Sequence, residues 1–441
     1  IQKLKSGDFD ESLISAIAAN LSFSQLQQYE SNTGRAYTLV DYFVNELQYN
    51  DILNKFNHMK TYSKQDVMDF ANKYFNTNCT VIYKITGTDP NTVKVPKPPI
   101  TPVVVNRDST SAFVKNILNE EVDPITPKFI DFNTDITKTT LNKSLPVYSV
   151  MNNENNRYEL YYIFDMGNNN DLYLPFAVRY LQYIGTATDN ASSIAKKFYY
   201  LASSYNVSAT NDEVYVSLSG PSDNFEAALS LFENLIHNCV SDSATFQNFI
   251  SSEMKNRSDA KLSKGQILSR LSDYLIYGRL NPSNHQLSDD LLKNMNSDQL
   301  INWLHQLTTY QHSIYYYGPL TATLLDKELK KFHKVPGKLK APPTPIVYSL
   351  SKPDQNTFYL VNYPMVQTEI LWKHPAGDFT TGVLPSLKVF NSYFGGGMSS
   401  LVFQTIRESK ALAYSTYSTT STPSKLTDPF IVNCYVGCQA D

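Results

Sequence analysis

The sequence has few cysteines and lacks the short motifs that mark several common classes of enzyme. Its 441 residues include four cysteines, none in a Cys-x-x-Cys pair, which argues against a disulfide framework and against a cysteine zinc site. No Gly-x-Ser-x-Gly elbow or Walker A loop is present, so neither a serine hydrolase of that kind nor a P-loop protein is indicated. None of the seven histidines lies in a His-x-x-Glu-His or His-x-x-x-His pattern.

Long hydrophobic runs and an excess of one charge are also missing. The longest apolar runs are far shorter than the roughly 20 residues of a membrane-spanning helix. The net charge is −3 and no tract rich in Lys or Arg occurs, so nothing points to a nucleic-acid partner. The chain does have 42% hydrophobic residues, enough for buried cores. At roughly 150 residues per domain, its length predicts two to four units.

Two proline-rich stretches divide the chain. PNTVKVPKPPITPVVV occupies residues 90–105, and VPGKLKAPPTPIV occupies residues 335–347. Because proline can neither continue a helix nor donate in a sheet ladder, both stretches are predicted to be extended connectors.

The blocks before the two connectors repeat one pattern. Each has a serine at the start of an amphipathic helix, with Ser63 and Ser297 as the predicted N-caps. Each then has a β-branched and aromatic run that ends on glycine, at residues 80–87 and 313–318, and both runs are predicted to be buried strands. The near-constant offset between the blocks indicates a duplication. The landmarks, 231 to 234 residues apart, are Asp41 and Asp273, Ser63 and Ser297, and Gly87 and Gly318.

The segments after the connectors also match each other. VYSVMNNENNRYELYY occupies residues 147–162, and VYSLSKPDQNTFYLVN occupies residues 347–362. Each has two strand-like runs around a polar turn, so a β-hairpin is predicted at the start of each of two domains. The chain therefore reads as domain end, domain start, domain end and domain start, which predicts a piece of a longer protein. Helices mixed with hairpins predict an α+β fold with antiparallel sheets backed by helices.

The segment FGGGMSSLVFQTIRESKALAYS, residues 394–415, is the strongest candidate for function. Its glycines can adopt positive φ and let another backbone approach closely, and a serine after them can cap the following helix. Two other interpretations stay open from the residues alone: an amphipathic helix with a solvated arginine, and a helix N-terminus that binds an anion. The residues concerned are Gly395, Gly396, Gly397, Ser399, Ser400 and Arg407.

This segment resembles the C-terminal-half signature of the pitrilysin/insulinase family of inverted-motif zinc metallopeptidases. That signature has glycines, Met/Ser-Ser, an apolar helix, Arg-Glu and then Leu-Ala-Tyr. KLKSGDFDESLISAIAANL near the start and QDVMDFANKYF at residues 65–75 resemble other parts of the same family. The resemblance spans the chain and is strongest to long bacterial members with four homologous domains.

The resemblance implies repeated domains of the mitochondrial-processing-peptidase metallohydrolase type. Residues 1–90 would be the C-terminal part of the second domain, and residues 91–140 the linker between the two halves. Residues 141–340 would be the third domain, with a degenerate zinc motif, and residues 341–441 the N-terminal part of the fourth.

In this family the zinc ion and the general base lie on a helix of the first domain, which this chain would lack. The corresponding stretch of the third domain is DLYLPFAVRYLQYIGT, residues 171–186. It places Phe176, Arg179 and Tyr180 at the positions of the two histidines and the glutamate. Phenylalanine has no ligand atom and arginine cannot act as a base near neutral pH, so no metal site is expected in this chain.

The resemblance also carries an arginine and a tyrosine of the fourth domain onto Arg407 and Tyr414. Both are expected to be catalytic groups, with the arginine and the glycines at 395–397 also contacting the substrate. The implied function is the zinc-free C-terminal portion of a metalloendopeptidase that degrades peptides in a closed chamber and is inactive on its own. The alternative is a non-catalytic structural or peptide-binding partner subunit of the same fold.

The expected partners are peptide substrates and the N-terminal half of the same protein, with a homodimer as a further option. No nucleic acid and no transmembrane segment are expected. The residues do not define the compartment, and the family favours the periplasm or cell envelope.

Overall fold

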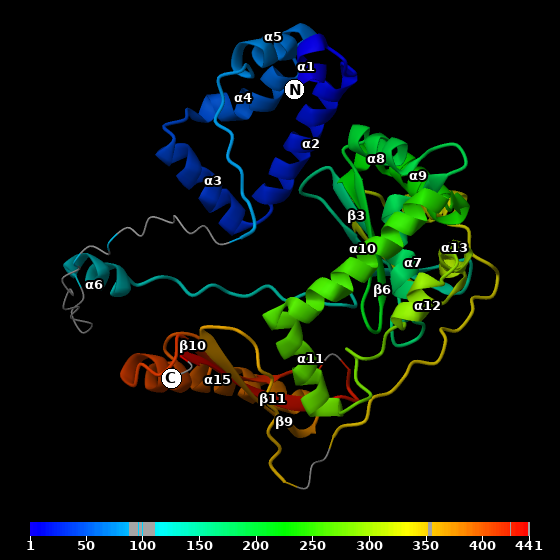
Figure 1. The fold of residues 1–441 in the computed structure, drawn as a ribbon. Coiled ribbons are helices and arrows are strands. Elements are labelled where there is room, and N and C mark those ends of the chain that lie inside the picture. Colours follow the sequence, from blue (N-terminus) through cyan, green and yellow to red (C-terminus); the bar gives the residue numbers. More distant parts are fainter. Residues whose placement is uncertain (88–95, 97–98, 100–110, 352–354, 424, 440–441) are drawn as a thin grey trace. The chain divides into compact units, whose positions relative to one another are not determined.

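The computed structural model of the chain describes residues 1–87, 96, 99, 111–351, 355–423 and 425–439 (Figure 1). The chain divides into two compact units. One unit comprises Ile1–Leu21 and Ser31–Ile136, and the other comprises Ser22–Glu30 and Thr137–Asp441.

The first unit is helical in its described part. Ser63 caps a helix as predicted, because its hydroxyl accepts from the backbone N–H of Asp66. The Asp66 carboxylate accepts from the backbone N–H of Ser63, which completes a capping box. The helices up to residue 118 are α1 (Gln2–Ser6), α2 (Ser12–Tyr29), α3 (Asn32–Val44), α4 (Tyr49–Met59), α5 (Lys64–Tyr74) and α6 (Ala112–Leu118).

The buried strand predicted at residues 80–87 is wrong. This segment has no strand, and Ile82, Tyr83 and Ile85 are each more than 80% exposed. A strand needs a neighbour to satisfy its backbone groups, and none pairs with this segment among the described residues. The connector predicted at residues 90–105 lies almost wholly outside the described residues.

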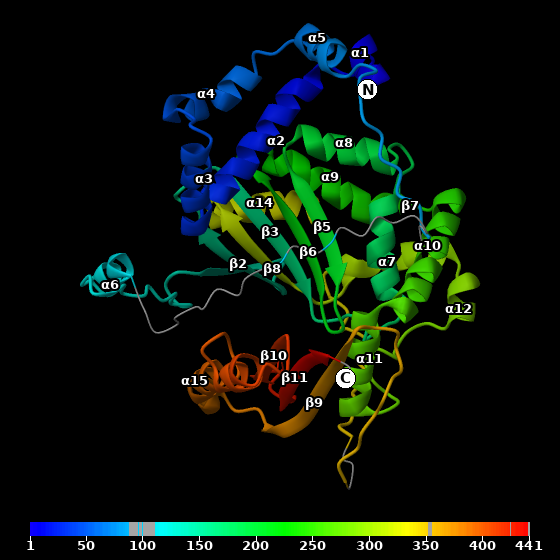
Figure 2. The ribbon, with the colours of Figure 1, turned by 60° about the vertical axis from the view of Figure 1, so that its left-hand side comes forward.

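A six-stranded sheet forms the centre of the second unit (Figure 2). Its order is β1-β2-β8-β3-β6-β5, and only the β2–β8 pair is parallel. The fold is therefore a mixture of helices and mainly antiparallel sheet, which confirms the predicted α+β class. The strands are β1 (Thr137–Leu141), β2 (Leu145–Met151), β3 (Arg157–Phe164), β5 (Ser204–Ala209), β6 (Val214–Pro221) and β8 (Ser313–Gly318), with a separate pair β4 (Gly185–Thr186) and β7 (Cys239–Val240).

The hairpin predicted at residues 147–162 is wrong, although both of its strands exist. β8 lies between β2 and β3, with Val147 opposite Ile314 on one side and Tyr161 opposite Tyr315 on the other. The polar turn is instead tied to the end of β8, because the backbone N–H of Asn152 donates to the carbonyl oxygen of Gly318 at 2.9 Å.

The second predicted hairpin, at residues 347–362, has no strand in its described residues. β2 and β3 pair with a third strand, β8, which comes about 150 residues later in the chain, and residues 347–362 have no such neighbour within the described residues.

The N-cap of helix α13 (Ser297–Gln306) lies one residue before the predicted Ser297. Asn296 caps this helix, accepting from the backbone N–H of Asp298, while the Gln299 side chain accepts from the N–H of Asn296.

Helices α9 and α14 pack on the six-stranded sheet and bury its apolar side chains. The strand β3 alternates, with Tyr158, Leu160, Tyr162 and Phe164 buried and the residues between them half-buried. Burying each such side chain contributes about 1.5–3 kcal/mol. The helices of this part are α7 (Leu174–Tyr180), α8 (Ala191–Tyr200), α9 (Phe225–Asn238), α10 (Ser243–Leu262), α11 (Lys264–Tyr277), α12 (Asp289–Lys293), α13 (Ser297–Gln306) and α14 (Ala322–Phe332).

The last hundred residues contain a smaller antiparallel sheet. Its order is β10-β11-β9, with β9 (Gln367–Asp378), β10 (Ser415–Ser421) and β11 (Pro429–Gln439), and α15 (Leu384–Phe394) packs on β10. The connector at residues 335–347 runs without helix or strand apart from one bridge between Tyr310 and Lys340. No helix in the described part of the chain combines the length and the apolar character needed to cross a bilayer.

Candidate functional site

The glycine-rich segment begins with a close approach of two backbones. Gly395 ends α15, and a Cβ added to it would lie 2.0 Å from the carbonyl oxygen of Ser418 on β10. Only glycine fits there. Gly397 has φ +86°, a left-handed conformation that also favours glycine. Gly395 is buried and packs the segment onto β10, whereas Gly396 and Gly397 are exposed, and the role of the three glycines as substrate contacts stays a prediction.

The helix after the glycines is capped by Ser400 and differs from the regular helix that the sequence predicts. The Ser400 hydroxyl donates to the carbonyl oxygen of Gly397 at 2.9 Å and accepts from the N–H of Phe403 at 3.4 Å. From Phe403 onward the chain forms the π-helix η5 (Phe403–Ser409) rather than a regular α-helix. Such widened turns are rare and occur frequently at functional sites.

Arg407 and Tyr414, predicted as one functional pair, are brought together by this geometry. The guanidinium carbon of Arg407 lies 5.6 Å from the centre of the Tyr414 ring and 4.8 Å from that of Phe403. A cation over an aromatic face contributes about 0.5–1 kcal/mol at exposed sites. The backbone N–H of Tyr414 donates to the carbonyl oxygen of Gly437, which fixes the tyrosine at the start of β10.

Both polar groups of the pair reach solvent. Tyr414 is 73% exposed, and the Arg407 side chain is 40% exposed. The nearest carboxylate to Arg407 is that of Glu408, with 3.9 Å between the Arg407 Nε and the carboxylate oxygen, the outer limit of an ion pair. The phenol and the guanidinium can therefore act on one bound molecule as hydrogen-bond donors.

The three residues of the degenerate motif occupy helix α7, and none offers a metal ligand. Phe176 is buried in the core, and Tyr180 is fully buried with its hydroxyl 3.1 Å from the Ser241 hydroxyl oxygen. Arg179 forms an ion pair of 2.8 Å with Glu253 on α10. A guanidinium therefore supplies positive charge beside this carboxylate. Within the described residues, no three His, Cys, Asp or Glu side chains gather closely enough to hold a metal ion.

A buried polar network in the second unit was not predicted. Glu233 of α9 accepts from the Tyr162 hydroxyl at 2.7 Å and from the Nδ1–H of His333 at 2.9 Å. The Nε2 atoms of His333 and His312 are 3.0 Å apart. His237 Nε2 lies 3.3 Å from the second Glu233 oxygen. The network joins α9 to β3 and to the residues that flank β8 and α14.

The hydrogen-bond partners fix the protons in this network. The Tyr310 carbonyl can only accept, so His312 Nδ1, 2.7 Å away, carries the hydrogen and His312 Nε2 accepts. His333 Nδ1 lies 2.9 Å from the Glu233 carboxylate oxygen and donates to it. Burial alone would raise the pKa of Glu233, but the contacts with His333, His237 and Tyr162 together outweigh it and lower the pKa to about 2. Burial and the adjacent His333 lower the pKa of His312 to about 3.

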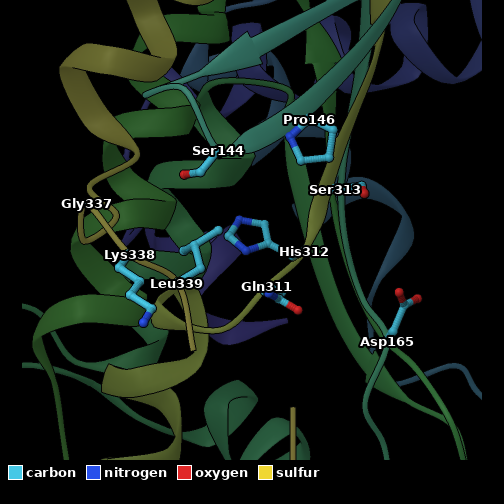
Figure 3. A pocket seen from close by; sticks show the side chains of 9 residues that line it. All are labelled: Ser144, Pro146, Asp165, Gln311, His312, Ser313, Gly337, Lys338 and Leu339. Atoms are coloured by element: carbon cyan, nitrogen blue, oxygen red, sulfur yellow. The ribbon is translucent and has the colours of Figure 1, made fainter. Parts of the chain in front are cut away.

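His312 also lines a pocket of about 420 Å³ (Figure 3). In this view Lys338 and Asp165 lie on opposite sides of His312, while Ser144 comes from the β1–β2 turn and Pro146 from the start of β2. Both nitrogens of His312 already have partners inside the protein, so the ring offers no free base to the pocket. The network therefore holds the sheet and helices together.

One signal in the sequence could have indicated the network. Glu233 lies among the apolar positions of the α9 stripe, four residues before His237, and a carboxylate in such a place needs a buried partner. The partners could not be named, because Tyr162 and His333 lie 71 and 100 residues away in the chain.

The family resemblance is confirmed by comparison with known proteins. Residues 295–441, a third of the chain, match the family model described as the peptidase M16 inactive domain. None of the curated proteins matches the chain.

Several solved structures share the fold. The peptidase M16 inactive domain from Pseudomonas fluorescens is 20% identical, with a TM-score of 0.55 over 68% of this chain and 74% of that chain. A mutant of the ferredoxin protease FusC, in complex with Arabidopsis ferredoxin, is 12% identical, with a TM-score of 0.58 over 93% of this chain and 47% of that chain. The periplasmic protease PqqL from Escherichia coli is 12% identical, with a TM-score of 0.56 over 94% and 46%. The chain thus spans about half the length of the two proteases.

Substituting His312 should change how stability depends on pH. The unfolded chain takes up a proton at this histidine near pH 6.5, but the folded chain does so only near pH 3. Protons therefore favour the unfolded chain within this window, and the free energy of unfolding should fall as the pH is lowered from about 6.5, by up to about 1.4 kcal/mol per pH unit. Glutamine keeps a donor and an acceptor without titrating, so His312→Gln should flatten this slope.

Urea unfolding at pH 7.5, 6 and 5, followed by tryptophan fluorescence, measures the slope. Trp303 stacks on Tyr310, whose carbonyl holds His312, and so reports on this region. His58→Gln, which removes an exposed histidine of the first unit, is the control and should keep the slope. An equal slope in the wild type and His312→Gln would contradict the assignment.

Gly395→Ala should loosen the packing of the glycine-rich segment on β10. The added methyl group would meet the Ser418 backbone at 2.0 Å, so one of the two chains must shift, at a cost of about 1–3 kcal/mol. Faster amide exchange across β10 and β11 would show the loss. Gly382→Ala is the matched control, because a Cβ there meets nothing within 4 Å. Equal exchange rates in the two variants would refute the close approach.

Proposed function

We propose that this chain is the metal-free portion of a zinc metalloendopeptidase, in which Arg407 and Tyr414 hold a peptide and stabilise its reacting carbonyl. The observation that carries the proposal is the pairing of an exposed phenol with a guanidinium 5.6 Å above its ring. Arg407 lies on a π-helical turn and Tyr414 directly precedes β10, and both lie inside the region that matches the M16 inactive domain.

The chemistry of the two groups fits this role. When a peptide bond is attacked, negative charge grows on the carbonyl oxygen, and a positioned phenol can donate a hydrogen bond to it. The guanidinium offers several N–H donors in a rigid fork, suited to neighbouring carbonyl groups or to a carboxylate. Its contact with the Tyr414 ring also holds the phenol in place. These donors favour the charged intermediate over the neutral substrate, as catalysis requires.

The zinc ion itself does not fit the three motif positions of helix α7. Phe176 and Tyr180 are packed in the core, and Arg179 is engaged by Glu253. We therefore assign the metal and the general base to another part of the polypeptide, the N-terminal half. The proteases FusC and PqqL, of which this chain spans about half, support that division.

The predicted boundaries belong to the same proposal. Residues 1–90 would form the C-terminal part of the second family domain, and residues 91–140 the linker. Residues 141–340 would form the third domain, and residues 341–441 the N-terminal part of the fourth. Peptides or unfolded proteins would be the substrates, and FusC has been solved with ferredoxin bound. The likeness to the periplasmic PqqL favours a periplasmic or cell-envelope location.

A second candidate function is a non-catalytic structural or peptide-binding subunit. It is favoured by the family description of residues 295–441 as an inactive domain. The two functions differ in what the reading frame encodes upstream of Ile1. A His-x-x-Glu-His helix there would support the peptidase, and its absence would favour the non-catalytic subunit.

Tyr414→Phe tests the proposed role of the phenol. In the enzyme that the whole reading frame encodes, the variant should lower kcat about 100- to 1000-fold, because one oxyanion donor is lost. KM should stay within about threefold, since the phenol acts mainly in the transition state. Hydrolysis of a quenched fluorescent peptide measures both constants.

Tyr417→Phe is the matched control. Tyr417 lies three residues further on β10 and stacks on Tyr435, so its hydroxyl is outside the proposed pair. This variant should keep kcat. Unchanged turnover in Tyr414→Phe would remove that tyrosine from the mechanism.

A further inference from the structure

A second pocket, of about 320 Å³, is lined by residues of α10 and α11 and of the segment that leads into α12. It is distinct from the Arg407–Tyr414 pair and from the pocket beside His312. Its lining side chains are mostly polar or cationic, and Leu287 is the one apolar side chain among them. The lining residues are Arg257, Lys261, Arg270, Asn284, Gln286, Leu287, Ser288 and Asp289.

The pocket carries an excess of positive charge. Three cationic side chains line it against one carboxylate, that of Asp289. Arg257 takes up this carboxylate, with 2.7 Å between the Arg257 Nη1 and the Asp289 oxygen. Lys261 and Arg270 have no hydrogen-bond or ion-pair partner within the described residues. Two cations are therefore left to face an incoming ligand.

The Arg257 side chain is held in place at one side of the pocket. Its side chain is 14% exposed, and it also donates to the carbonyl oxygen of Leu287 at 2.8 Å. Its guanidinium carbon lies 5.9 Å from the Phe176 ring, which Arg179 approaches to 4.5 Å. The pocket therefore adjoins helix α7, whose motif positions hold no metal ligand.

The lining favours a carboxylate within a peptide. A guanidinium and an ammonium group bind carboxylates through charge-assisted hydrogen bonds. The side-chain amides of Asn284 and Gln286 can both donate to and accept from peptide groups. No aromatic side chain lines the pocket, so there is no surface on which a nucleic-acid base would stack.

We infer that this pocket binds the carboxylates of acidic peptide segments and gives the protein a preference for acidic peptides. The inference rests on the proposed function, because it takes an extended peptide as the ligand. The binding should weaken with salt, because Lys261 is exposed and Arg270 half-buried.

Fluorescence anisotropy of two labelled peptides tests the preference. One peptide carries several glutamates, and the other carries glutamine at the same positions. The 441-residue chain should bind the glutamate peptide about fivefold more tightly or better, the range that two partly exposed charge contacts provide. The double variant Lys261→Gln/Arg270→Gln should bind both peptides equally, and Arg257 is left unchanged because it holds the loop at residues 287–289.

Lys255→Gln is the matched control. Lys255 lies on the same helix but is exposed outside the pocket and pairs with Asp259. It should keep the preference for glutamate. An equal loss in Lys255→Gln would show a diffuse charge effect and overturn the site.

The remaining outcomes separate this inference from the proposed function. Equal binding of both peptides by the wild type would overturn the acidic pocket and leave peptide binding intact. Binding of neither peptide would overturn both. Inorganic phosphate that displaces the glutamate peptide at equal concentration would show a site for small anions and overturn the peptide assignment.

Discussion

The second unit depends on one strand, β8, which supplies backbone hydrogen bonds to both of its neighbours. β8 is parallel to β2 and antiparallel to β3, so these two strands meet only through it. The chain must therefore close a loop of about 150 residues before the centre of the sheet can form. The conformational entropy of that loop is lost before the strand contacts stabilise it. The segments at 80–87 and 347–362 illustrate the same need of a strand for a hydrogen-bonded neighbour. Their compositions favour strands, but in their described residues neither segment pairs with a neighbouring strand.

The buried pair of Glu233 and His333 strengthens this arrangement at the points where helices cover the strands. Removing the Glu233 carboxylate from water costs several kcal/mol, and a buried carboxylate is tolerated only when hydrogen bonds satisfy it. Tyr162 on β3 donates to Glu233, and His312, the residue before β8, contacts His333. The pair thus fixes the positions of α9 and of the end of α14 relative to the sheet. Loss of His333 would leave an uncompensated carboxylate charge in an apolar core.

Local patterns in the sequence predicted the elements better than their arrangement. The capping of α5 by Ser63 and the strand at 313–318 follow from spacing and residue type, because these signals act within a few residues. The insertion of β8 between β2 and β3 depends on pairing between distant segments, which no local pattern contains. At α13 the neighbouring Asn296 and Ser297 are both good caps, and the geometry of the turn selects the asparagine. The pairing of Arg407 with Tyr414 came from the family signature, whereas the π-helical turn that presents the arginine had no signal in the sequence.

Helix α7 shows which groups occupy the positions that the family resemblance assigns to a degenerate zinc motif. Arg179 forms an ion pair with Glu253, and its guanidinium also lies over the Phe176 ring. Arg257 approaches the same ring and neutralises Asp289. This region therefore carries fixed guanidinium groups, which attract anionic groups and cannot act as a base that activates water. In the proposed function, anion binding here and charge stabilisation at Arg407 and Tyr414 would be separate tasks.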